Sequence, residues 1–266
     1  MNIGFMQGRL VKPLHAAVQE FPALGWEKEL AIANKINFKL IEWVVDKESI
    51  SSNPLLINSD YVKTVLENNE ITIGSLSDDF FLQNENTNIF SEQILVHMEK
   101  VFTKMSELNI SIYVLPLLES KSIRKLKISE QIFLLKKIEE LVPENIRVCI
   151  ESDLDSKNIN LIFDSIDKNI FRINYDIGNS AYEGYDFQEE INSYFDLIEN
   201  VHIKDRTFKG PTVPLGEGDA KVTDVLKELK YKGYNKNLII QASRIPHMDD
   251  VELMTKYRKF VENAIL

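Results

Sequence analysis

Four polar side chains follow or end short apolar runs in the second half of the chain, and together they could bind a metal ion. Glu151 and Asp176 end two of these runs, and His202 and Gln241 lie at the ends of two later ones. Two carboxylates, an imidazole and an amide oxygen form a mixed oxygen and nitrogen set, which suits a divalent ion. We therefore predict one divalent metal ion as cofactor, of the kind Mn²⁺, Mg²⁺, Co²⁺ or Zn²⁺.

The spacing of these residues is typical of successive strand–helix units. Glu151, Asp176 and His202 follow one another at intervals of 25 and 26 residues, and Gln241 comes 39 residues later, which leaves room for a long loop. In a barrel of parallel strands, alternate side chains point into the lumen. All four residues would then face the lumen near the C-terminal strand ends, where barrel enzymes carry their chemistry.

Short apolar runs alternate with longer amphipathic segments along the whole chain. Runs rich in Ile, Val, Phe or Tyr predict eight buried strands, at Ile3–Met6, Phe38–Trp43, Ile71–Leu76, Ile110–Leu118, Ile146–Ile150, Ile170–Tyr175, Asn200–Ile203 and Leu238–Ile240. Helical spacing predicts helices that include Trp26–Ile36, Asp60–Asn68, Ser91–Leu108, Ser129–Val142, a segment after Asp186, Thr223–Lys232 and Asp250–Ala264. Strands separated by helices run parallel. We predict an α/β fold, a single (β/α)₈ TIM barrel, because no glycine-rich dinucleotide fingerprint supports an open doubly wound sheet.

Length and composition limit the function classes. The 266 residues show no linker or composition break, so we expect one domain over residues 1–266. The formal charge of −10 argues against nucleic acid and anionic membranes as partners. Neither a signal peptide nor a bilayer-spanning run is recognisable. The single cysteine, Cys149, fits a reducing compartment, so we expect a cytoplasmic location, with homo-oligomer formation left open.

Several segments resemble the xylose isomerase-like barrel superfamily, which contains sugar and sugar-phosphate isomerases and epimerases. They are GFMQGRL in the first strand, IEW in the second, IES around Glu151, YDIGN at 175–179, VHIKDR at 201–206 and PLGEGD at 214–219. The resemblance implies that Glu151, Asp176, His202 and position 241 hold one divalent metal ion. It also implies a small sugar or sugar phosphate as ligand, although one scaffold serves many sugars.

Position 241 departs from the family pattern, because Gln stands where the family usually has a Glu that also carries a proton. A Gln oxygen can coordinate a metal ion, but Gln cannot exchange a proton near neutral pH. The resemblance implies proton transfer through a cis-enediolate, with Glu151 as the only carboxylate base that the family pattern places. That favours single-base isomerisation, whereas epimerisation needs another group on the far face. Strand-end position offers Lys204, Glu42, Asp78, Asp79 and Glu119. We predict Glu151 and Lys204 as catalytic, because Lys204 shares its inward face with His202. The other interpretation of Lys204, a salt bridge to a carboxylate near the barrel mouth, stays open.

Further polar residues at strand ends are predicted to bind the substrate. Arg9 follows the first strand, where a guanidinium would hold a phosphate or carboxylate. Arg206 and Arg244 follow the seventh and eighth strands, the part of a barrel that often binds phosphate. The LGEGD segment either presents backbone N–H groups to an anion or forms a tight turn. The predicted substrate-binding set is Gln7, Arg9, Glu42, Glu119, Arg206 and Arg244.

Three other functions stay open. Gln241 suggests a sugar-binding barrel with lost or altered catalysis. A dehydratase acting on a cyclic polyol is intermediate between such a binding protein and an isomerase. A hydrolase of the related apurinic-endonuclease type would carry an Asp-x-His segment just before its GEG loop. Gly210 and Thr212 occupy those positions, and the chain has only four His, so this hydrolase is disfavoured.

Overall fold

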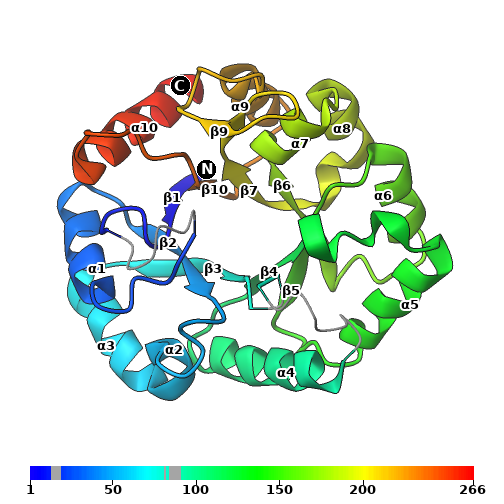
Figure 1. Cartoon of the computed structure of the whole chain (residues 1–266), viewed down its shortest axis with the longest axis horizontal. Helices are drawn as coiled ribbons and strands as arrows, with labels where there is room; N and C mark the ends of the chain where they lie inside the picture. Colours follow the sequence, from blue (N-terminus) through cyan, green and yellow to red (C-terminus); the bar gives the residue numbers. More distant parts are fainter. Residues whose placement is uncertain (13–18, 81, 84–90) are drawn as a thin grey trace.

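Eight parallel strands close into a ring in the computed structural model, which describes residues 1–12, 19–80, 82–83 and 91–266 (Figure 1). In ring order they are β1 (Asn2–Met6), β10 (Asn237–Ile240), β7 (Ile198–Ile203), β6 (Phe171–Asp176), β5 (Arg147–Ser152), β4 (Ile112–Leu117), β3 (Thr72–Asp78) and β2 (Leu40–Val45). The predicted (β/α)₈ barrel is confirmed, and each predicted run overlaps one strand of the ring, with bounds that differ by a few residues.

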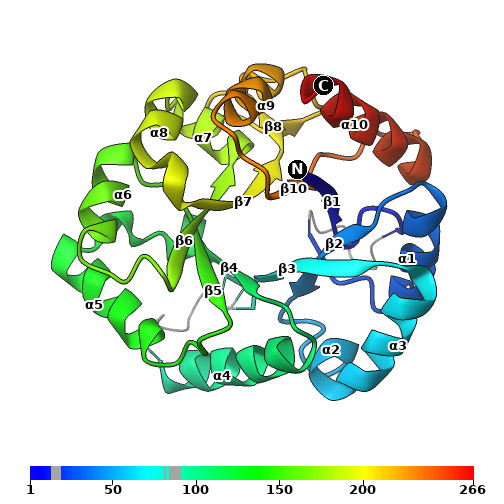
Figure 2. The same ribbon diagram turned by 180° about the vertical axis from the view of Figure 1, so that it is seen from behind.

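Helices cover the outside of the ring, as Figure 2 shows from behind. They are α1 (Trp26–Lys35), α2 (Pro54–Ile57), α3 (Ser59–Asn69), α4 (Glu92–Glu107), α5 (Ile128–Glu139), α6 (Ser156–Phe163), α7 (Ile177–Glu183), α8 (Phe187–Tyr194), α9 (Val222–Tyr231) and α10 (Asp250–Ala264). Short 3₁₀ turns lie at Glu119–Lys121, Ile123–Lys125 and Phe195–Leu197. Within the described ranges, none of the helices is both long and apolar enough to pass through a membrane.

Three of these helices, α2, α6 and α7, were not predicted, because they have only four to eight residues, at most about two turns. Side-chain caps mark where they begin. Asp155 accepts a hydrogen bond from the backbone N of Asn158, and Asp176 accepts one from Asn179. The second cap matters for the site, because Asp176 is both the last residue of β6 and the N-cap of α7.

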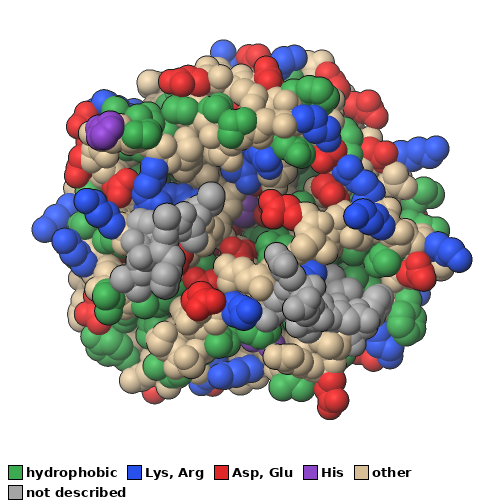
Figure 3. All heavy atoms as spheres, in the orientation of Figure 1, with side chains coloured by type: hydrophobic (Ala, Val, Ile, Leu, Met, Phe, Trp, Pro, Cys, Tyr) green, Lys and Arg blue, Asp and Glu red, His purple; other side chains and the backbone are tan. Residues whose placement is uncertain are grey.

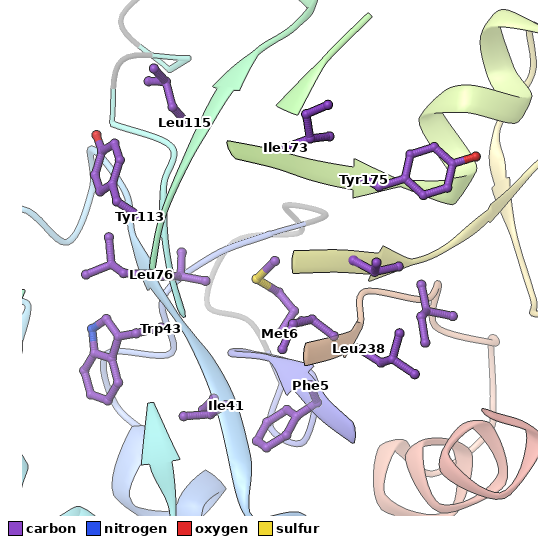
Figure 4. Packing of buried hydrophobic residues seen from close by; sticks show 14 of the residues in the cluster. Phe5, Met6, Ile41, Trp43, Leu76, Tyr113, Leu115, Ile173, Tyr175 and Leu238 are labelled. Carbon is purple, nitrogen blue, oxygen red and sulfur yellow. The ribbon is translucent and has the colours of Figure 1, made fainter. Parts of the chain in front are cut away.

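In β6 the alternating pattern sends apolar side chains outward and polar ones inward. Figure 4 shows Ile173 and Tyr175 of β6 among the buried hydrophobic residues, while Asn174 and Asp176 alternate with them along the strand. Inside the ring, Ile112, Val114 and Cys149 form a small separate apolar cluster. The polar side chains of β5 and β6 lie one step further along the strands, towards their C-terminal ends.

Candidate metal centre

Glu151, Asp176 and His202 meet at the C-terminal ends of β5, β6 and β7. The register pairs Asp176 with His202 across β6 and β7. One ligand atom from each of the three residues lies within 4.8 Å of the others. All three are buried, with exposed fractions of 5% or less. Two carboxylate oxygens and one imidazole nitrogen at this separation fit a divalent cation.

Glu42 fixes the ring of His202 so that one nitrogen faces the two carboxylates. His202 Nε2 lies 2.7 Å from Glu42 Oε1 and donates its proton there, which leaves Nδ1 to face Glu151 Oε2 at 3.2 Å. Glu42 is itself held by Ser75 Oγ at 2.5 Å and Asn200 Nδ2 at 2.9 Å. Burial alone would lower the pKa of His202, but the charges of Glu42 and Glu151 raise it well above its usual value. The same anions favour a bound cation.

Asparagine side chains hold Glu151 in place. Asn174 Nδ2 donates to Glu151 Oε2 at 2.9 Å, and Asn179 Nδ2 donates to Oε1 at 2.7 Å. Asn174 Oδ1 in turn accepts from Asn200 Nδ2 at 2.7 Å. Sequence reasoning assigned these asparagines no role, although Asn174 and Asn200 share the inward face with Asp176 and His202. Their alternation with apolar residues was the available signal.

The two carboxylate oxygens of Asp176 have different partners: one accepts a backbone hydrogen bond and the other faces a cation. Its Oδ1 caps α7, whereas Oδ2 lies 2.6 Å from Lys204 Nζ and receives no well-oriented hydrogen bond from the described residues. Burial would raise the pKa of Asp176, but Lys204 and His202 together hold it well below its usual value. A buried, ionised carboxylate whose free oxygen faces a cation has the charge that a metal ligand requires.

Gln241 joins this cluster through Lys204. It follows β10 directly, and its Oε1 accepts a hydrogen bond from Lys204 Nζ at 3.0 Å. Its Nε2 donates to Gln19 Oε1 at 2.7 Å. The structure therefore places Gln241 beside the predicted ligands, one ammonium group away from Asp176. Its role as a fourth ligand stays a prediction.

A cleft of about 950 Å³ opens above the cluster, and Figure 3 shows the hollow near the centre of this face, with acidic and basic side chains around it. Seven of the residues predicted for the site line the cleft, namely Arg9, Glu119, Glu151, Lys204, Arg206, Gln241 and Arg244. Gln7 and Glu42 are fully buried and are not among the described residues that line it. Gln7 Oε1 instead accepts from the backbone N of Val44, so it joins β1 to β2.

The three arginines at the cleft have different surroundings, and each carries a positive charge. Arg206 donates to Asn179 Oδ1 at 3.0 Å and lies over the ring of Tyr182. Arg244 donates to Asp250 Oδ1 at 3.1 Å and to backbone oxygens that follow β1. Burial and the nearby charge of Arg244 lower the pKa of Arg9 to about 10, so it is still charged at neutral pH. The cleft therefore offers several fixed cations to an anionic or polyhydroxylated ligand.

The LGEGD segment is a tight turn, and its backbone donors are already used. Asp205 Oδ2 accepts from the backbone N of Gly216 and Gly218, and its Oδ1 accepts from that of Ala220. A Cβ atom at Gly218 would lie 2.2 Å from Asp205 Oδ1, so a side chain there would break this arrangement. The turn is thus the correct one of the two sequence interpretations.

Comparison with known proteins agrees with this geometry. Residues 30–257 match the family model described as xylose isomerase-like TIM barrel. A curated relative, the inosose dehydratase of Clostridium perfringens, is 24% identical over 126 residues, and the match spans only 40% of this chain and 42% of that protein's length.

Solved structures resemble the whole chain. D-allulose 3-epimerase from Methylomonas sp., in complex with D-allulose, has a TM-score of 0.73 at 13% identity, covering 99% of this chain and 97% of that one. The IOLI protein with a bound zinc atom has a TM-score of 0.73 at 14% identity, covering 100% and 98%. At these identities the likeness shows a shared fold.

Proposed function

The chain belongs to the xylose isomerase-like TIM barrel family, and on that premise we propose that it is a metal-dependent enzyme that isomerises or epimerises a small sugar or sugar phosphate. The observation that carries this proposal is the buried cluster of Glu151, Asp176 and His202 beneath a polar cleft. The epimerase and the zinc-containing protein among the structural neighbours support it.

Glu151 is the proposed base, because its carboxylate can reach a substrate in the cleft and is held in a fixed orientation. It lines the cleft, and two asparagine amides fix both of its oxygens. From there it removes the proton on the carbon next to the substrate carbonyl, and a cis-enediolate forms. Glu151, Asp176 and His202, with Gln241 as the proposed fourth ligand, would hold a divalent ion, which when bound would supply Lewis-acid stabilisation of the oxygen charge.

Lys204 contributes a second positive charge at the same place. Its ammonium lies between Asp176 Oδ2 and Gln241 Oε1 and lines the cleft. A group held by two acceptors is well placed to stabilise negative charge on the enediolate, so we propose an electrostatic role for Lys204. Arg9, Arg206 and Arg244 are the proposed ligands for the polar end of the substrate, with Glu119 at the rim.

Deuterium exchange tests the proposal directly. The protein is incubated in D₂O with Mn²⁺ and D-fructose, D-allulose or D-tagatose, and NMR records deuterium at the carbons next to the carbonyl. We expect incorporation that stops when EDTA removes the metal ion. No incorporation with any of these sugars, under conditions where Mn²⁺ binds, would contradict the proposal.

A dehydratase acting on a cyclic polyol is the second candidate, and the inosose dehydratase relative favours it. Both reactions begin with removal of a proton next to a carbonyl, so Glu151 would serve either. Dehydration then expels a hydroxyl group instead of returning a proton to carbon. Incubation with an inosose separates the two, because only the dehydratase gives a product lighter by one water, detected by mass spectrometry.

Substitution of Gln241 by Glu distinguishes an enzyme from a sugar-binding barrel. Glu would keep the contact with Lys204 but would bring an oxygen against Gln19 Oε1, where Gln241 Nε2 now donates at 2.7 Å. This hydrogen bond is partly buried, and a typical one contributes about 0.5–1.5 kcal/mol. If that amount is lost from the positioning of the transition state, the exchange rate falls roughly tenfold. The control Gln131→Glu removes an amide donor of α5 that bonds to the backbone O of Ile123 and does not line the cleft. Activity that appears only in Gln241→Glu would instead identify the parent chain as a binding protein.

A further inference from the structure

We propose that Asp79 is a second catalytic residue of this site, a proton donor to the reacting carbon from the wall of the cleft formed by β3, while Glu151 acts from the wall formed by β5. The inference rests on the proposed function and deepens it, since it assigns the group that epimerisation requires on another face of the substrate.

The two carboxyl groups come from strands that are two apart in the ring. Asp79 directly follows β3, Glu151 lies in β5, and β4 runs between the two strands. Asp78 contacts His97 on the outer side of the barrel, and the next residue, Asp79, lies on the cleft side. Both carboxyl groups line the same cleft. One substrate can therefore contact both of them.

The partners of Asp79 are neutral. Gln19 Nε2 donates to its Oδ2 at 2.7 Å, and Ser77 Oγ donates to its Oδ1 at 3.2 Å. Among the described residues, no Lys, Arg or His lies within ion-pair distance of it, and the charge of Arg9, which also lines the cleft, interacts with it from further away. Because Gln19 also accepts from Gln241, a chain of amides joins Asp79 to the position that lacks a carboxylate.

The surroundings of the Asp79 carboxyl group favour its protonated form up to a higher pH than is usual for an aspartate. Burial has the largest effect, and the charges of Glu151, Asp78 and Glu42 add to it, so that the pKa of Asp79 rises to about 7. The hydrogen bond from Ser77 acts in the opposite direction. Near neutral pH a large share of the molecules therefore carries the proton that a donor must release.

The other candidates are less suited to this role. Asp78 accepts hydrogen bonds from Tyr113 and the backbone N of Phe80 and contacts His97, on the outer side of the strand. Glu42 is held behind His202, and Lys204 is paired with Asp176. Glu119 lines the cleft but is exposed to solvent.

The proposed step balances without another reactant. Glu151 takes the proton from carbon, and the electrons of the broken C–H bond form the enediolate. The enediolate carbon then forms a new C–H bond with the proton of the Asp79 carboxyl group. Glu151 ends protonated and Asp79 ionised, and proton exchange with water restores both.

The test uses Asp79→Asn and compares two readouts on the same sugar. In D₂O with Mn²⁺ and D-allulose, D-fructose or D-tagatose, NMR gives both deuterium exchange and epimer formed. Asn can still accept from Gln19 but cannot release a proton. We expect exchange within about threefold of the parent and a fall in the ratio of epimer to exchange of about 10²-fold or more. Asp78→Asn is the matched control, and its ratio should not change.

Two further measurements do not depend on turnover. The Mn²⁺ dissociation constant, measured by calorimetry, should be the same in Asp79→Asn as in the parent. A ¹³C-labelled Asp carboxyl resonance that titrates near pH 7 should be present in the metal-free parent and absent from Asp79→Asn. A resonance from Asp79 that titrates below pH 5 would overturn the inference.

The outcomes separate the two proposals. If the parent exchanges no deuterium with any sugar, the proposed function fails and the inference fails with it. If the parent epimerises and Asp79→Asn keeps the same ratio, only the role of Asp79 is overturned. Exchange without any epimer in the parent also overturns the role of Asp79, whereas the isomerase function stands.

Discussion

Glu151→Gln is expected to reduce deuterium exchange by about 10²–10⁴-fold, the usual contribution of a general base. The amide keeps the size of the side chain but cannot take a proton. Its NH₂ group would also meet Asn174 Nδ2 or Asn179 Nδ2, which now donate to the carboxylate. The measurement is the exchange rate in D₂O with saturating Mn²⁺, so that a weaker metal site does not account for the loss.

Glu199→Gln is the matched control for this substitution. Glu199 is also a buried carboxylate, near the start of β7, where it pairs with Arg147 and Lys236. It lies at the end of the barrel away from the cleft. The control should lose some stability and keep its exchange rate. Equal rates in Glu151→Gln and the parent would exclude Glu151 as the base.

Asp176→Asn is expected to abolish the response of the protein to metal ions. A ligand at 100 times its dissociation constant stabilises a protein by about 2.7 kcal/mol, so Mn²⁺ should raise the melting temperature of the parent. In the variant, Oδ1 can still cap α7, but an NH₂ group replaces the ionised oxygen that faces Lys204. Mutating a residue that only hydrogen-bonds to a metal ligand costs about 10–100-fold in metal affinity. Because Asp176 is itself a proposed ligand, we expect a larger loss in Asp176→Asn.

The control for Asp176→Asn is Asp78→Asn. Asp78 is a fully buried carboxylate that contacts His97 and Tyr113, so its loss should lower stability. Its melting temperature should nevertheless rise with Mn²⁺ as in the parent. A full Mn²⁺ shift in Asp176→Asn, with an unchanged dissociation constant from calorimetry, would show that Asp176 is not a ligand.

The sequence alone determined the barrel and the positions of its main candidate ligands. Alternation along a strand is a local property, so Asn174 to Asp176 could be oriented from their neighbours without knowing what lies across the ring. Successive strand–helix units then bring Glu151, Asp176 and His202 to one rim. The short helices α6 and α7 escaped prediction, since they have only eight and seven residues, too few for a repeated apolar stripe to stand out.

Only the tertiary structure decided which polar groups touch each other across the ring. Glu42 and His202 are 160 residues apart, and their strands are not neighbours, so no spacing in the sequence announces that Glu42 orients the imidazole rather than the substrate. The same holds for Asp78 and Asp79, adjacent residues of one type. Strand β3 turns one towards His97 and the other into the cleft, because neighbouring side chains must leave a strand on opposite faces.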